Sequence, residues 1–200
     1  MNAIPPSAVV TAFSDARDER LAAGELAAKL RHDHLGCVLF FCSIDYRLDR
    51  LAGALAEAFG DLPLCGCTSA GEITSRGYDS GTIVAIGFDR RFFSVGARLI
   101  ERLDGFSLAD AQQLTDSLLC ECRAASVARV DADNTFVLTL LDGLSVNEEL
   151  VLATLNSALG SITSLGGSAG DDYRLSGTYV YSDGAFHSNA AMVLMINSAL

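Results

Sequence analysis

The chain has 200 residues, of which 14 are basic and 25 acidic, so its formal net charge is −11. A net anion of this size is repelled by phosphate backbones and by anionic lipids, which argues against a protein that binds nucleic acid or membrane surfaces. Half of the residues are apolar, enough for the core of one domain or of two tightly fused halves.

The N-terminal residues, Met1 to Pro6, have neither the basic nor the apolar segment of a signal peptide. The longest apolar runs, at 37–42 and 190–196, are much shorter than the ~20 residues that span a bilayer. We therefore expect a cytoplasmic protein.

The chain contains six cysteines, and four of them form two C-x-C pairs, Cys65/Cys67 and Cys120/Cys122. A reducing cytosol does not favour a disulfide framework, and zinc ligands are usually spaced C-x₂₋₄-C. Because free cysteine is among the most buried residue types, we expect core packing and predict no metal site.

Hydrophobic periodicity and turn residues predict alternating strands and helices along the chain. In the first half we expect strands over 7–13, 37–42, 63–67, 82–88 and 92–100, and helices over 16–31 and 46–59. The last two strands read as a hairpin across Asp89-Arg90-Arg91. A helix over 107–125 follows, with Ser107 as its N-cap.

The second half repeats this order of elements. We expect strands over 135–141, 162–165 and 190–196, a hairpin over 178–186, and a helix over 146–159. Ser145 would cap this helix, with Glu148 completing a capping box.

Two segments, 38–72 and 137–171, align without a gap, and each ends in Ser-Ala-Gly followed by an acid. We interpret the chain as one domain over 1–200, made of two pseudo-repeats at about 36–100 and 135–197 that the helix at about 107–125 joins. The predicted class is α/β: duplicated strand–helix–strand units forming a mixed, largely parallel sheet with helices packed on it.

The repeated loops follow predicted strands, where open α/β sheets bind ligands. Backbone N–H groups there could bind a carboxylate, and the acid could bind an amine or hydroxyl. The alternative is a tight turn in which the acid hydrogen-bonds to its own loop. The candidate ligand-binding residues are Thr68, Ser69, Gly71, Glu72, Asp142, Gly143, Gly166, Gly167, Ser168, Gly170, Asp171 and Asp172.

Two further interpretations stay open. Residues 166–170 match the letters of a G-x-S-x-G nucleophile elbow, although no helix pattern follows; a hydrolase would use Ser168 or Cys67. His187 is the one candidate haem ligand, since a single histidine can hold haem iron.

Three ordered motifs resemble the FIST (F-box and intracellular signal transduction) sensory domain, in its N-terminal portion. They are Gly66 to Ile73 (GCTSAGEI), Leu141 to Glu149 (LDGLSVNEE) and Gly166 to Asp172 (GGSAGDD).

This resemblance implies a mainly bacterial, intracellular input domain for signal transduction that binds a small ligand, with amino acids proposed. The partners it implies are histidine kinases, cyclic-dinucleotide enzymes or chemotaxis receptors. Some members are haem proteins that sense nitric oxide. Members usually continue into a C-terminal FIST portion, so we expect this chain to be a piece of a longer protein.

Overall fold

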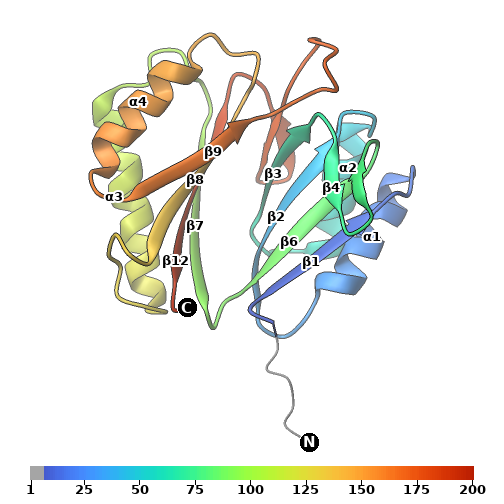
Figure 1. Cartoon of the computed structure of the whole chain (residues 1–200), viewed down its shortest axis with the longest axis horizontal. Coiled ribbons are helices and arrows are strands. Elements are labelled where there is room, and N and C mark those ends of the chain that lie inside the picture. The colour runs from blue at the N-terminus through green and yellow to red at the C-terminus, as the bar shows by residue number, and fades with distance from the viewer. Residues whose placement is uncertain (1–6) are drawn as a thin grey trace, which may run out of the picture.

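The computed structural model describes residues 7–200; the N-terminal residues Met1 to Pro6 lie outside the described part. Two mixed sheets pack face to face, and each carries two helices on its outer face, giving four layers in the order α, β, β, α (Figure 1). The mixed sheets with helices packed on them confirm the predicted α/β class.

The first sheet has the strand order β1-β6-β2-β3-β10-β11. Its strands are β1 (Val9–Ser14), β2 (Leu35–Ser43), β3 (Leu64–Ser69), β6 (Ile83–Asp89), β10 (Val180–Ser182) and β11 (Ala185–His187). The helices α1 (Glu19–Leu30) and α2 (Leu48–Phe59) cover its outer face. β2 is apolar along most of its length because it is buried between these helices and the second sheet.

The second sheet has the strand order β7-β12-β8-β9. Its strands are β7 (Phe93–Ile100), β8 (Thr135–Leu141), β9 (Thr163–Ser168) and β12 (Ala191–Ser198). The helices α3 (Leu108–Ala125) and α4 (Glu148–Leu159) cover its outer face. A small separate hairpin, β4 (Glu72–Thr74) with β5 (Gly77–Asp79), projects from the first sheet.

The core between the sheets is apolar and draws on both halves of the chain. Leu39 and Cys67 from the first sheet meet Leu140, Met192 and Leu194 from the second in one buried cluster. Two further clusters lie between each sheet and its own helices. The halves are therefore joined through a shared interior.

The two sheets share one order of elements, which extends further than the aligned segments. β1, α1, β2, α2, β3 and β6 correspond to β7, α3, β8, α4, β9 and β12. Equivalent bonds mark the correspondence: the Ser43 amide donates to the Thr82 carbonyl at 2.9 Å, and the Asp142 amide to the Ala190 carbonyl at 3.0 Å. The units are divided between two sheets, and only β2–β3 and β8–β9 pair in parallel among the ladders of residues 7–200.

The predicted hairpin of strands 82–88 and 92–100 is wrong. β6 pairs with β1 and β2 in the first sheet, whereas β7 pairs with β12 in the second. The chain turns a corner between them, where the rings of Phe88 and Phe93 meet edge to face at 5.4 Å. β7 joins the second sheet because its apolar residues complete the cluster between the two sheets.

Three helix starts also differ from the prediction, and among them α2 begins at Leu48 and not at residue 46. α1 begins at Glu19 because Asp18 accepts a bond from the amide of Leu21, at 2.9 Å. α4 begins at Glu148, and Glu148 binds Ser168 and does not complete a capping box. α3 has the predicted Ser107 cap, in a capping box with Asp110.

Candidate functional site

A cavity of about 720 Å³ lies on the inner face of the first sheet, over β1, β6 and β2 and next to β4. Its apolar lining consists of Ala12, Phe13, Phe41, Ile73, Val84, Ala85 and Ile86, and its polar lining of Thr11, Lys29, Ser69, Glu72, Thr74 and Ser75, together with Gly71. Such a size and such a mostly apolar wall with a few polar groups are typical of small-molecule sites.

The wall of this cavity follows from strand alternation. On β6, Ile83 and Ala85 point to the helices and are buried, whereas Val84 and Ile86 point to the other face and are only half-buried. Thr11 on β1 is exposed in the same way. The second sheet does not fully cover this part of the first, so the cavity stays accessible.

Glu72 is the most constrained polar group of the cavity. It is 2% exposed, and its carboxylate accepts bonds from Ser69 Oγ at 2.7 Å, from Thr82 Oγ1 at 2.8 Å and from the Thr82 amide at 3.2 Å. Burial raises the pKa of Glu72 above its usual value in spite of these bonds. A buried acid with a shifted pKa in a cavity is typical of a functional group, and Oε1, with one bond, can accept another donor.

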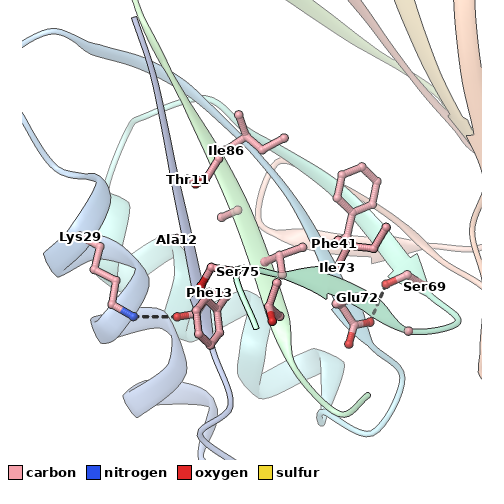
Figure 2. Close-up of a pocket in the computed structure, with 14 residues that line it drawn as sticks. Thr11, Ala12, Phe13, Lys29, Phe41, Ser69, Glu72, Ile73, Ser75 and Ile86 are labelled. Atoms are coloured by element: carbon pink, nitrogen blue, oxygen red, sulfur yellow. Dashed lines mark hydrogen bonds between the residues drawn. The ribbon is translucent and has the colours of Figure 1, made fainter. Parts of the chain in front are cut away.

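Lys29 supplies a positive charge at the other side of the cavity. Its Nζ donates to the Phe13 carbonyl at 2.8 Å and lies 5.1 Å from the centroid of the Phe13 ring. Figure 2 shows Lys29 at one side, Glu72 with Ser69 at the other, and Phe13 between them. The cavity therefore presents opposite charges across an aromatic surface.

The two Ser-Ala-Gly loops meet at their tips. The Gly170 amide donates to the Thr68 carbonyl at 2.9 Å, and a Cβ on Gly170 would lie 2.7 Å from the Ala70 nitrogen. Thr68 itself is buried and pairs with Tyr179 through its amide and its hydroxyl. Among the candidates, Ser69, Gly71 and Glu72 line the cavity.

The acids of the second half bind their own backbone. Asp171 accepts bonds from the amides of Leu175, Ser176 and Gly177, and these bonds, that from Ser176 first, lower the pKa of Asp171 to about 2. Asp142 accepts from the Leu144 and Asn189 amides and from Thr178 Oγ1. Both carboxylates thus hold loops in place.

The remaining candidates do not line the cavity. Asp172 is 3.5 Å from Ser43 Oγ, and Gly143 packs against the Ala169 carbonyl. Gly166, Gly167 and Ser168 were expected in a loop but belong to β9.

Neither of the two hydrolase candidates lines the cavity. Ser168 Oγ binds Glu148, and residues 169–179 after β9 contain no helix, unlike the strand–turn–helix of a nucleophile elbow. Burial raises the pKa of the Cys67 thiol to about 12, which keeps it protonated.

His187 does not fit a haem ligand at this cavity. It lies on β11, with Nε2 3.3 Å from the Ser182 carbonyl, and it is not part of the cavity wall. Within residues 7–200, no three His, Cys, Asp or Glu side chains are grouped so as to hold a metal ion. No helix in the same range is long and apolar enough to cross a membrane.

Lys29, Phe13, Phe41 and Ile86 were not expected to take part in a site. Lys29 is the only lysine of the chain, and this rarity could have marked it as a candidate site residue. The strand residues could have been found from alternation along β1 and β6, had the pairing of these strands been known.

The FIST N domain family model matches residues 36–200. The chain belongs to the FIST N domain family. It is thus a sensory domain of signal transduction, and the matched region contains every candidate residue named from the loops.

No curated protein matches the chain. Among solved structures, the chain is similar to the cyanuric acid hydrolase from A. caulinodans, with a TM-score of 0.47 and 10% identity. The similarity covers 94% of this chain and 67% of the hydrolase.

Proposed function

We propose that this FIST N domain is a cytoplasmic input domain that binds an amino-acid-like molecule in the cavity over β1, β6 and β2. The ligand ammonium group binds the Glu72 carboxylate, and its carboxylate binds Lys29. The observation that carries the proposal is the pairing of a buried acid and a lysine at opposite sides of one apolar cavity.

The chemistry of the wall suits such a ligand. An ammonium group offers Glu72 a charge-assisted hydrogen bond and compensates for the burial of its carboxylate. Phe13, Phe41 and Ile86 offer an apolar surface to the side chain of the ligand. A carboxylate and an ammonium group in one cavity with an apolar wall favour a zwitterion with an apolar side chain over a simple carboxylic acid.

The β4–β5 hairpin is the element through which binding would be reported to a partner. Glu72 begins β4, and Ile73 and Tyr78 form the adjacent cross-strand pair, with exposures of 82% and 73%. A ligand held by Glu72 orders the hairpin and with it this exposed pair. A partner signalling protein, such as a histidine kinase or a cyclic-dinucleotide enzyme, contacts the ordered pair.

Thermal unfolding and calorimetric titration with the twenty amino acids, and with their amines and carboxylic acids, test the proposal. A ligand at 100 times its Kd stabilises the folded state by about 2.7 kcal/mol, which raises the Tm of a domain of this size by roughly 5–10 °C. We expect a shift with at least one amino acid and a smaller one with its carboxylic acid analogue.

Two variants test the acidic and the basic end of the site one at a time. Glu72→Gln should abolish binding of both the amino acid and its amine, whereas Lys29→Met should weaken only ligands that carry a carboxylate. Glu57→Gln, the same change on the exposed face of α2, is the matched control. Binding that survives Glu72→Gln unchanged, or no shift with any compound, would refute the proposal.

A further inference from the structure

The edge of the second sheet at β9 differs from the other sheet edges. The edge strands of residues 7–200 are β1 and β11 in the first sheet and β7 and β9 in the second. Lys29 donates to a carbonyl of β1, Arg98 donates to the Ala97 carbonyl of β7, and β11 has only three residues. Such charges and short lengths keep edges from pairing with other chains.

β9 has none of these protections. Its six residues, Thr163 to Ser168, contain no charged residue and no proline. Five of the six are exposed, and Leu165 is an exposed apolar side chain on this edge. An uncharged, exposed edge of this kind is a template for another strand.

The neutral surface extends beyond β9. From Leu150 to Gly170 the chain has no Asp, Glu, Lys or Arg, the longest such stretch in a sequence that is 20% charged. This stretch includes the exposed Ala153, Asn156 and Ser157 of α4. Depletion of charged residues is the compositional mark of interface cores.

We propose that the β9 edge pairs with β9 of a second copy of this chain, antiparallel and across a two-fold axis. A second copy fits this edge because the edge carries no charge and can pair with itself; the net charge of −11 on each chain repels a second copy over the rest of the surface and least here. A two-fold axis also brings the same surface of both copies together, as in most dimers.

The position of the nearby acids favours the antiparallel arrangement. Glu148 and Glu149 lie at the end of the edge where Ser168 binds Glu148, whereas Ser161 and Ile162 precede β9 at the other end. In an antiparallel pair the acidic end of each copy lies next to the neutral end of the other. A parallel pair would place the acids side by side.

The backbone predicts the register. The Ala169 amide donates to the Leu141 carbonyl of β8, so alternation along the strand points the N–H and C=O groups of Ser164, Gly166 and Ser168 away from β8. These groups pair across the axis when Gly166 lies opposite Gly166 of the second copy. Leu165 then lies opposite Gly167 of the second copy, which has no side chain to obstruct it.

Sedimentation equilibrium over a range of concentrations tests this dimer. We expect the mass to rise from 21.1 kDa to twice that value, and Leu165→Lys to weaken dimerisation at least tenfold. Leu21→Lys on α1 is the matched control, because Leu21 is 56% exposed and Leu165 57%; it should leave dimerisation unchanged.

Hydrogen exchange provides a measurement without a variant. The amides of Ser164, Gly166 and Ser168 should exchange more slowly at high than at low protein concentration. A chain that is monomeric at all concentrations, including one that binds a strand of another protein instead, would overturn the proposal. So would a dimer that persists in a folded Leu165→Lys chain.

Discussion

The Gly170 amide donates to the Thr68 carbonyl across 2.9 Å, and this bond ties the second Ser-Ala-Gly loop to the first. The loops come from the ends of β9 and β3, which lie in different sheets. The bond therefore connects the cavity wall at Ser69 and Glu72 to the second half of the chain.

Gly170→Ala should destabilise the fold because the new Cβ would lie 2.7 Å from the Ala70 nitrogen, on backbone that cannot move aside. We expect a loss of roughly 1–3 kcal/mol, the usual cost of overpacking, measured by urea unfolding. Gly53→Ala on α2 is the control, since no atom lies within 4 Å of its added Cβ, and within a helix it should leave stability unchanged or raise it by up to about 1 kcal/mol. Equal effects of the two changes would contradict the close contact.

Glu72 should make stability depend on pH. Its pKa in the folded chain is raised above the ordinary 4.5, chiefly by burial, so the folded state binds the proton more tightly than the unfolded state. The stability that this proton confers is present below pH 4.5 and is lost as the pH rises through the raised pKa of the folded chain.

Unfolding free energies of the parent and of Glu72→Gln, measured from acid to neutral pH, check this dependence. The parent should lose stability relative to the variant as the pH rises, because glutamine does not titrate. Glu57→Gln at an exposed position should show no such trend. A difference that grows in the opposite direction would mean that the hydrogen bonds of Glu72 outweigh its burial.

Asp89 and Arg91 stabilise the corner between β6 and β7. Arg91 donates to the buried Asp89 carboxylate through Nε at 3.0 Å and Nη2 at 2.6 Å, and this contact is the main cause that lowers the pKa of Asp89 to about 2. Asp89→Asn should cost at most roughly 2 kcal/mol near neutral pH, because a pKa lowered from 3.8 to about 2 corresponds to about that free energy and water partly screens the half-exposed Arg91.

The cost of Asp89→Asn should shrink as the pH falls from 3.8 towards 2, where the parent loses the same charge. Urea unfolding at several pH values measures it. The exposed pair of Arg76 and Asp79 is the comparison, and Asp79→Asn should change stability by less than about 1 kcal/mol. Similar costs for the two variants would argue against a stabilised corner.

The cysteines should differ sharply in reactivity. Cys120 is exposed, whereas the other five thiols are buried, and burial raises the pKa of Cys42, Cys67 and Cys122. Ellman's reagent should therefore modify one thiol quickly in the folded protein and all six after denaturation. Cys120→Ser should remove the fast phase, and a fast phase that remains would indicate that a buried thiol becomes exposed.

Sequence patterns predicted the elements that depend on local chemistry. The strand Thr135–Leu141 and the capped helix Leu108–Ala125 have the expected bounds, because alternation of apolar residues and a Ser107 cap act within a few residues. Glycines Gly60 and Gly160 end their helices with positive φ, as their lack of a side chain allows.

Sequence patterns could not predict how the strands pair. The local signals of β6 and β7 fit a hairpin equally well, and only the demand for an apolar layer between the sheets separates them. Glu72 and Asp171 both follow Ser-Ala-Gly, yet Glu72 lines a cavity and Asp171 only binds its own loop.

β10 gives the duplicated chain a property that two linked domains would lack. This strand comes from the second half but pairs with β3, so it extends the first sheet. Each half is therefore incomplete alone: the first lacks a neighbour for β3, and both lose the layer between the sheets. A chain divided between Arg90 and Arg91 should give two pieces that regain structure only when mixed, and the intact protein should unfold in one cooperative transition.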